Sequence, residues 1–335
     1  MKFRKHLNDV ERMRGSYPAP GSIRLASAER DSSFSESMYK KFIDSLCDTD
    51  IRYYPDVDHA LNVLSKFTGV PTNHLTVGHG SDQIIKNVFE CFVLEGTNVV
   101  TTDPCFPMYK VYASVMNAEV RAAGYSNKRV DVDQMVDLID DNTSLVVFSN
   151  PCSPIGDIFS TGDIERLIKK ARSCGCIVLI DEAYQEFSAT PSWIEKYTEY
   201  QNIIVTRTFS KAVGAAGLRF GYGVANEVTL NLLSKVKSMY EITGPTIKWM
   251  ETVIDNWDDV QLYVDKVRIN KYIITAELEK QGYEVVPGYC NWIHTTKNNY
   301  IKSLDTKQCK LPWDDRTWTR LCIPSRRETV GFILE

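Results

Sequence analysis

Four short apolar runs, separated by amphipathic stretches, constrain the fold of this chain more than any other feature of its sequence. The runs are rich in Val and Ile and cover residues 98–102, 145–149, 176–183 and 202–206, which predicts short buried strands. Residues 81–96 and 161–175 carry apolar side chains at helical spacing, begin at a hydroxyl residue and close on glycine. Strands that alternate with helices predict an α/β fold with a mostly parallel sheet, covered on both faces.

The pattern changes near residue 245, where one or two long helices are predicted, followed by short strand candidates such as residues 283–288. A chain of 335 residues suits one large and one smaller domain, since single cores stop growing at roughly 250 to 300 residues. We therefore predict a large domain over 45–244 and a small α+β domain over 245–335, with an N-terminal arm over 1–44 that packs with the small domain.

Charge and hydropathy argue against several classes of protein. The net charge is −4 and both signs are interspersed, whereas nucleic-acid binding needs a clustered basic face. No window approaches the roughly 18 apolar residues of a membrane span, and the N-terminus lacks the apolar core of a secretory signal. The nine scattered cysteines have neither disulfide-framework nor zinc-site spacing. We expect a cytoplasmic protein without a metal site, a nucleic-acid partner or a membrane partner.

Polar residues follow several predicted strands, at the sheet edge where open α/β folds bind ligands. Gly78 and Gly80 permit a tight turn into a helix, so the backbone N–H groups of Ser81 and Asp82 either face an anion or form an ordinary helix start. Asn150 ends the strand over 145–149. Its side chain either holds a ligand oxygen or satisfies the backbone of its own turn.

Asp181 stands at the end of a very apolar strand, and Tyr184 follows three residues later. Burying an unpaired carboxylate is costly. Asp181 therefore reaches solvent, pairs with a cation of the protein, or meets a cationic ligand. Tyr184 is close enough along the chain to serve the same site.

Lys211 lies in a stretch of small and apolar residues after a predicted strand, with Ser210 beside it and Arg219 beyond. A lysine kept from water has a lowered pKa and attacks carbonyls as a neutral amine, while serine and arginine suit a phosphate. Together with Asp181, these residues match a single ligand that carries an aldehyde, a basic ring nitrogen and a phosphate. Pyridoxal 5'-phosphate (PLP) has all three.

In order along the chain, the motifs RYYPD (52–56), VGHGSDQII (77–85), NPCSPIG (150–156), DEAYQEF (181–187), RTFSKAVGAAGLRFGY (207–222) and RRETVG (326–331) complete the pattern. The chain resembles the fold-type I PLP-dependent aminotransferases, most closely the histidinol-phosphate aminotransferase family. The resemblance implies a large domain with a mostly parallel sheet and a smaller α+β domain.

The resemblance also implies the roles of the cofactor residues. Lys211 would form the Schiff base and carry the proton, Asp181 would pair with the pyridine nitrogen, and Asn150 and Tyr184 would bond the phenolic oxygen. Phe106 would stack on the cofactor ring. The phosphate would be held by Ser81, Asp82, Ser210 and Arg219.

Tyr54 matches a tyrosine that reaches the phosphate of the neighbouring subunit, which implies a homodimer with shared sites. Arg327 matches the arginine that grips the α-carboxylate, and Tyr17 and Arg30 of the arm are placed on the substrate side. The chain departs from the family where residues 28–31 read Ala-Glu-Arg-Asp in place of Asn-Glu-Asn-Pro. The residues that would bind the cofactor match the family, whereas those near the substrate are altered. This pattern favours the same chemistry on a different substrate.

The predicted function is a PLP-dependent transamination between a donor pair, glutamate and 2-oxoglutarate by resemblance, and a small, phosphorylated amino or oxo compound. The alternative is a PLP-dependent decarboxylase of a phosphorylated amino acid. Such an enzyme shares the scaffold, because the bond that is cleaved depends on how the substrate stands on the ring.

Overall fold

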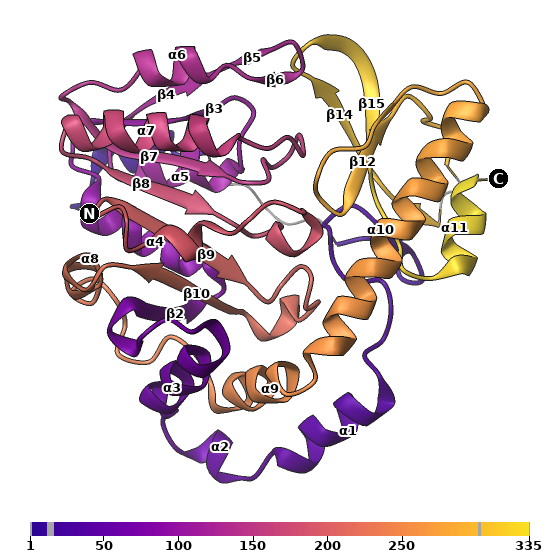
Figure 1. Cartoon of the computed structure of the whole chain (residues 1–335), viewed down its shortest axis with the longest axis horizontal. Coiled ribbons are helices and arrows are strands. Elements are labelled where there is room, and N and C mark those ends of the chain that lie inside the picture. The colour runs from indigo at the N-terminus through magenta and orange to yellow at the C-terminus, as the bar shows by residue number, and fades with distance from the viewer. Residues whose placement is uncertain (1, 12–16, 301–302, 335) are drawn as a thin grey trace.

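The computed structural model describes residues 2–11, 17–300 and 303–334. Its centre is a seven-stranded sheet (Figure 1). The strand order is β2 (Leu75–His79), β10 (Phe220–Ala225), β9 (Ile203–Thr208), β8 (Ile177–Asp181), β7 (Thr143–Ser149), β3 (Asn98–Thr102) and β4 (Glu119–Ala123). All neighbours pair in parallel except β10, which is antiparallel to both β2 and β9. The predicted α/β fold with a mostly parallel sheet is confirmed.

Helices cover both faces of this sheet, because each central strand is apolar on both sides (Figure 1). Leu145 and Val147 of β7 pack in one core with helices α4 and α5, whereas Val146 and Phe148 pack in the other with α7. The covering helices are α3 (Val57–Thr68), α4 (Ser81–Phe92), α5 (Pro107–Val115), α6 (Val132–Asp137), α7 (Thr161–Ser173) and α8 (Glu227–Leu233).

Two predicted elements end earlier in the structure than in the sequence pattern. Helix α4 ends at Phe92, since the chain turns before Gly96, which adopts a φ of +79°. Strand β8 ends at Asp181, because the Ala183 backbone N–H bonds the Asp181 carboxylate and turns the chain out of the sheet.

The C-terminal part holds a second, four-stranded antiparallel sheet. Its order is β11 (Val285–Val286), β12 (Trp292–Thr295), β15 (Asp314–Cys322) and β14 (Lys307–Leu311). The long helical segment is two helices, α9 (Gly244–Ile254) and α10 (Trp257–Lys280), and the last described helix is α11 (Arg327–Leu334). Figure 1 shows α10 rising from α9, beside the large sheet, to the smaller one.

The N-terminal segment crosses between the two sheets (Figure 1). Strand β1 (Ile23–Arg24) pairs in parallel with β13 (Leu304–Asp305), and α1 (Glu36–Ser45) and α2 (Thr49–Arg52) pack on α9. The remaining short strands are β5 (Tyr125–Ser126) and β6 (Arg129–Val130). The arm thus contacts elements from both ends of the predicted small domain, a division that stays a prediction.

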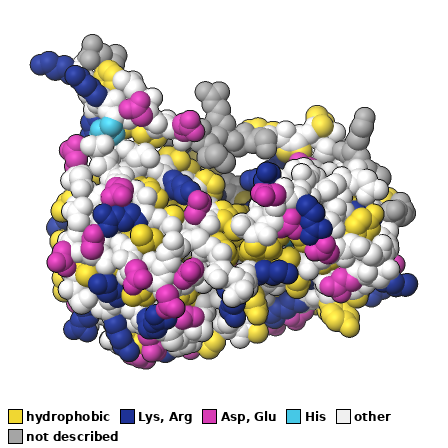
Figure 2. Space-filling view, turned by 90° about the horizontal axis from the view of Figure 1, so that it is seen from above, with side chains coloured by type: hydrophobic (Ala, Val, Ile, Leu, Met, Phe, Trp, Pro, Cys, Tyr) yellow, Lys and Arg dark blue, Asp and Glu magenta, His cyan; other side chains and the backbone are white. Residues whose placement is uncertain are grey.

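Charged side chains of both signs are mixed over the face seen in Figure 2, without a basic stretch. Across residues 2–11, 17–300 and 303–334, no helix combines the length and the apolarity that crossing a bilayer requires.

Candidate active site

An anion cradle forms where β2 runs into α4. Gly80 adopts a φ of +76°, and a Cβ on it would lie 2.6 Å from Arg219 Nη2. A Cβ on Gly221 would overlap the backbone nitrogen of Ser81. Glycine at both positions therefore lets Arg219 approach the start of α4, where its Nη1 donates to Ser210 Oγ over 3.3 Å. A helix N-terminus, a hydroxyl and a guanidinium converge as a phosphate requires.

The carboxylate of Asp181, at the end of β8, is 5% exposed. It accepts hydrogen bonds from Tyr109 Oη at 2.9 Å, the Ala183 backbone at 3.2 Å and Thr206 Oγ1 at 3.3 Å. Desolvation still raises its pKa to about 6, against those three donors. The sequence left three possible environments for the Asp181 carboxylate: solvent, a cation of the protein, or a cationic ligand. Its burial excludes solvent, and its partners are hydroxyl and amide donors rather than a cation of the protein. The arrangement favours a cationic ligand.

Lys211 follows β9 and points to the same region. Its Nζ donates to the Ser27 carbonyl over 2.8 Å and lies 5.6 Å from the centre of the Tyr184 ring. The Tyr184 ring is buried, edge-on to Trp292 at 4.7 Å. Desolvation lowers the Lys211 pKa, which favours the neutral amine that attacks carbonyls.

Three further residues predicted for the cofactor line the surrounding turns. Asn150 is buried, and its Oδ1 accepts from the Phe159 backbone at 3.1 Å, so it does satisfy a local backbone group. Asp82 accepts from Tyr112 Oη at 3.0 Å. Phe106 precedes α5. Their cofactor roles stay predictions.

Three residues predicted for the substrate or the second subunit are exposed at the surface. Tyr54 is 78% exposed and stacks on Tyr240, with ring centres 4.3 Å apart. Tyr17 is exposed, and Arg327 is an exposed residue at the start of α11. Among the described residues none of these three side chains bonds Lys211, Arg327 lines a cavity together with Arg30, and their roles stay predictions.

Arg30 is half-buried and lies between two aromatic rings. Its guanidinium lies 4.8 Å from the Phe34 ring centre and 4.4 Å from that of Tyr263, and its Nη1 donates to the Val213 carbonyl at 3.4 Å. A Cβ on Gly214 would overlap the Arg30 side chain. Arg30 therefore ties the arm to the loop that carries Lys211, and its contact with substrate stays a prediction.

Arg320 on β15 is a candidate that sequence reasoning missed. Its Nη2 donates to the Ala26 carbonyl at 2.6 Å, its guanidinium lies 5.2 Å from the Trp292 ring centre, and its charge helps lower the Lys211 pKa. Its Nε is buried without a hydrogen-bond partner among the described residues. Lys307 faces Arg320 across the strands. The available signal was an arginine inside an otherwise apolar strand end, TRLCI.

Together, the sheet, the cradle and the Lys211–Asp181 cluster define a fold-type I aminotransferase. Residues 22–305 match aminotransferase class I and II, and the chain belongs to that family. The histidinol-phosphate aminotransferase of Clostridium novyi (strain NT) is 29% identical, covering 99% of this chain and 95% of its own. That of Christiangramia forsetii is 30% identical over 78% of this chain and 76% of its own.

A solved structure supports the same fold. The histidinol-phosphate aminotransferase of Sinorhizobium meliloti, crystallised in complex with pyridoxal-5'-phosphate, superposes with a TM-score of 0.82 at 19% identity. The match covers 93% of this chain and 89% of that one.

Proposed function

We propose that this enzyme moves an amino group between glutamate and 2-oxoglutarate on one side and a small, phosphorylated amino or oxo compound on the other. PLP is its cofactor. The observation that carries the proposal is the convergence of a desolvated lysine, a buried aspartate and an anion cradle, Lys211, Asp181 and Ser210–Arg219. The relatives named above, histidinol-phosphate aminotransferases, support the substrate class.

The residues present fit the cofactor. The cradle suits its phosphate, and the buried Asp181 suits a protonated ring nitrogen, because a neighbouring cation keeps the carboxylate ionised at neutral pH. When bound, PLP supplies an electron sink. Asn150 and Tyr184 would orient the ring, and Phe106 would stack on it. Lys211, with its lowered pKa, would take the proton from the substrate Cα at its Nζ.

The substrate's anionic group is proposed to bind at Arg320. Like charges directly opposite across two strands are unfavourable, yet Lys307 and Arg320 occupy such positions. Burial, followed by the Arg320 charge, lowers the Lys307 pKa. An anion bound between the two cations would relieve this repulsion and give the free Arg320 Nε an acceptor.

We also propose a homodimer in which Tyr54 completes the partner's site. Exposed large apolar side chains lie near it, namely Ile51, Tyr53, Met239 and Tyr240, although charged residues such as Asp56 and Lys248 line the cavity beside it. Contiguous exposed apolar surface marks interfaces. A cytoplasmic location is proposed as well, supported by nine cysteines that are all free thiols.

The test begins with absorbance. Purified protein should show the visible band of lysine-bound PLP, and Lys211→Ala should lose cofactor that borohydride can fix. Glutamate should then convert the wild-type band to that of the pyridoxamine form. A wild-type protein that never takes up PLP would overturn the proposal. Release of CO₂ from a phosphorylated amino acid, with no half-reaction on any amino donor, would establish the decarboxylase instead.

A further inference from the structure

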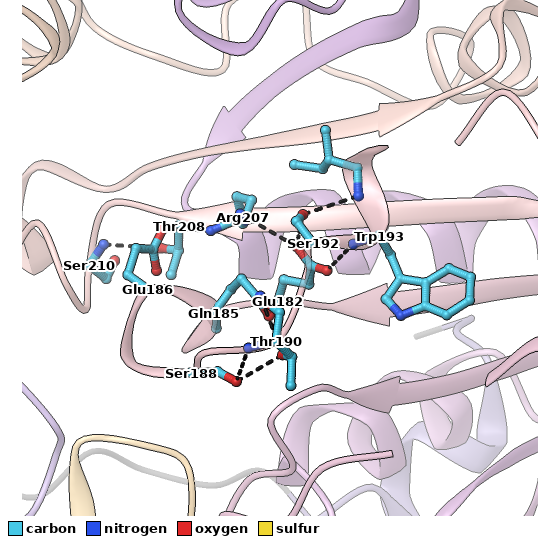
Figure 3. Close-up of polar contacts among 12 residues, drawn as sticks. Glu182, Gln185, Glu186, Ser188, Thr190, Ser192, Trp193, Arg207, Thr208 and Ser210 are labelled. Carbon is cyan, nitrogen blue, oxygen red and sulfur yellow. Dashed lines mark hydrogen bonds and ion pairs between the residues drawn. The ribbon is translucent and has the colours of Figure 1, made fainter. Parts of the chain in front are cut away.

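On β9, the arginine Arg207 forms ion pairs with two carboxylates, Glu182 and Glu186 (Figure 3). Arg207 Nε lies 3.0 Å from Glu182 Oε2, and Arg207 Nη1 donates to Glu186 Oε1 over 2.7 Å. The Glu182 side chain is fully buried, and those of Arg207 and Glu186 are 15% and 13% exposed. These three residues form the Arg207 network, which is buried at Glu182 and partly exposed at Arg207 and Glu186, where both side chains line a cavity.

On the β8 side, the network fixes the turn that carries Tyr184. Glu182 directly follows Asp181, and Glu186 lies two residues beyond Tyr184. The Glu182 backbone N–H donates to the Thr206 carbonyl at 2.9 Å. Its carboxylate also accepts from Ser192 Oγ and from the Trp193 backbone, both at 2.6 Å. Both ends of the 182–186 turn are therefore anchored to one guanidinium (Figure 3).

On the β9 side, the network adjoins the segment that carries Lys211. Arg207 lies between Thr206, which donates to Asp181 at 3.3 Å, and Thr208, whose Oγ1 accepts from the Ser210 backbone at 3.1 Å. Successive strand residues face opposite sides. The two threonines therefore face the Asp181 side and Arg207 faces away, so Arg207 acts on the site through its neighbours.

The chemistry of the guanidinium explains why arginine stands here. A planar fork of donors holds two carboxylates at once, whereas a lysine ammonium is a single point charge. Without the fork, two like charges would be buried within one turn. Arg268 also holds the end of the turn by donating to the carbonyls of residues 186–188, so the network adds the side-chain anchors, and without it the two carboxylates would separate or take up water.

We infer that Arg207 and Glu186 are positioning residues, which hold the Tyr184 hydroxyl and the Lys211 amine in register with the bound cofactor. The inference rests on the proposed function. Substitution of Arg207 or Glu186 should therefore disturb the position of Lys211 relative to the cofactor ring, while the anion cradle around Arg219 stays intact.

Two variants test this. Arg207→Lys keeps the charge but loses the fork, and Glu186→Gln keeps the shape but loses one charge. The matched control is Glu241→Gln, which breaks the Lys237–Glu241 ion pair, 3.0 Å long with side chains 19% and 3% exposed. Lys237 otherwise bonds Thr76 Oγ1 and the Val77 carbonyl, outside the proposed site. All are measured as holoenzyme.

The absorbance of the bound cofactor is titrated with pH. In both test variants, the midpoint of this titration should differ from that of the wild type by about half a pH unit or more. Their kcat should fall roughly tenfold while the KM for glutamate stays within about twofold. Glu241→Gln should change neither quantity, even where its melting temperature falls as far as theirs. A purely structural network would lower only the melting temperature.

The inference is overturned if Arg207→Lys and Glu186→Gln match Glu241→Gln in midpoint and kcat. If Arg207→Lys does not accumulate as folded protein, Glu186→Gln decides alone. A wild-type protein without a cofactor band would contradict the proposed function itself, so the two failures are distinct.

Discussion

At the scale of single residues, Asp181 has the clearest energetic signature. Its pKa rises from 3.8 to about 6 because the folded protein desolvates it. In the cofactor-free protein, the native state therefore binds more protons than the unfolded chain between these values, and stability falls as pH rises through that window. A difference of about two between the pKa values corresponds to about 3 kcal/mol.

Asp181→Asn should remove this dependence. Relative to the wild type, the cofactor-free variant should gain roughly 2 to 3 kcal/mol of unfolding free energy between pH 4 and pH 7. Urea denaturation at both pH values measures it. Parallel pH profiles for the two proteins would contradict the burial of an ionised Asp181.

Arg320 and Arg327 are alternative candidates for the residue that binds the substrate's carboxylate. A charge-assisted bidentate contact is worth about 2 to 3 kcal/mol, so Arg320→Lys should raise the KM for glutamate about 30- to 160-fold. Arg327→Lys is the control, because Arg327 is exposed on α11. Steady-state kinetics would favour the sequence-based assignment if Arg327→Lys alone raised the KM.

Some residues of the candidate site can be predicted from the sequence, whereas Arg320 cannot. Lys211, Asp181, Ser210 and Arg219 follow strand ends or a glycine turn, where the chain order itself indicates the shared edge. Arg320 faces the same region only because antiparallel β12 and β15 place it over Trp292. No local spacing encodes that register.

At the scale of elements, the two connections that flank α4 offer a matched pair of glycines. Gly80 and Gly96 adopt nearly the same φ, +76° and +79°, but only a Cβ at Gly80 meets another group, Arg219. Gly96→Ala should therefore cost about 1 kcal/mol of stability and leave cofactor affinity unchanged. Gly80→Ala should cost the same or more and weaken PLP binding at least about tenfold.

Fluorescence titration of PLP with each alanine variant tests the pair. Equal cofactor affinities in Gly80→Ala and Gly96→Ala would mean that the approach of Arg219 does not matter for the phosphate. Urea denaturation gives the stability difference, so that a general loss of fold is separated from a local loss of the cradle.

The same scale shows why some elements escaped prediction. Strand β10 holds two glycines, Gly221 and Gly223, which depress strand propensity. Gly221 is required by its neighbour, since a Cβ there would overlap Ser81. The parallel strands β3, β7, β8 and β9, by contrast, are buried on both faces and read as continuous apolar runs.

At the scale of the whole molecule, shared sites in a homodimer would make two inactive variants complement each other. In a heterodimer of Tyr54→Ala and Lys211→Ala subunits, one site would hold both wild-type residues and the other neither. Random reassociation of equal amounts should restore about a quarter of wild-type activity, since half the dimers are mixed. Mixtures that stay as inactive as the separate variants would contradict a shared site.

The position of the arm determines when its contacts can form during synthesis. Residues 23–31 are synthesised long before residues 304–325, on which they dock: Leu25 accepts from the Cys322 backbone, Asp31 from Ser325, and β1 pairs with β13. Until residues 304–325 have been synthesised, the arm lacks these backbone partners, although its contacts with residues 211–263 can form. Ser27, which contacts Lys211, sits within it. The segment that places the Ser27 carbonyl on Lys211 is therefore pinned at both β13 and β15 only after residues 304–325 have been synthesised.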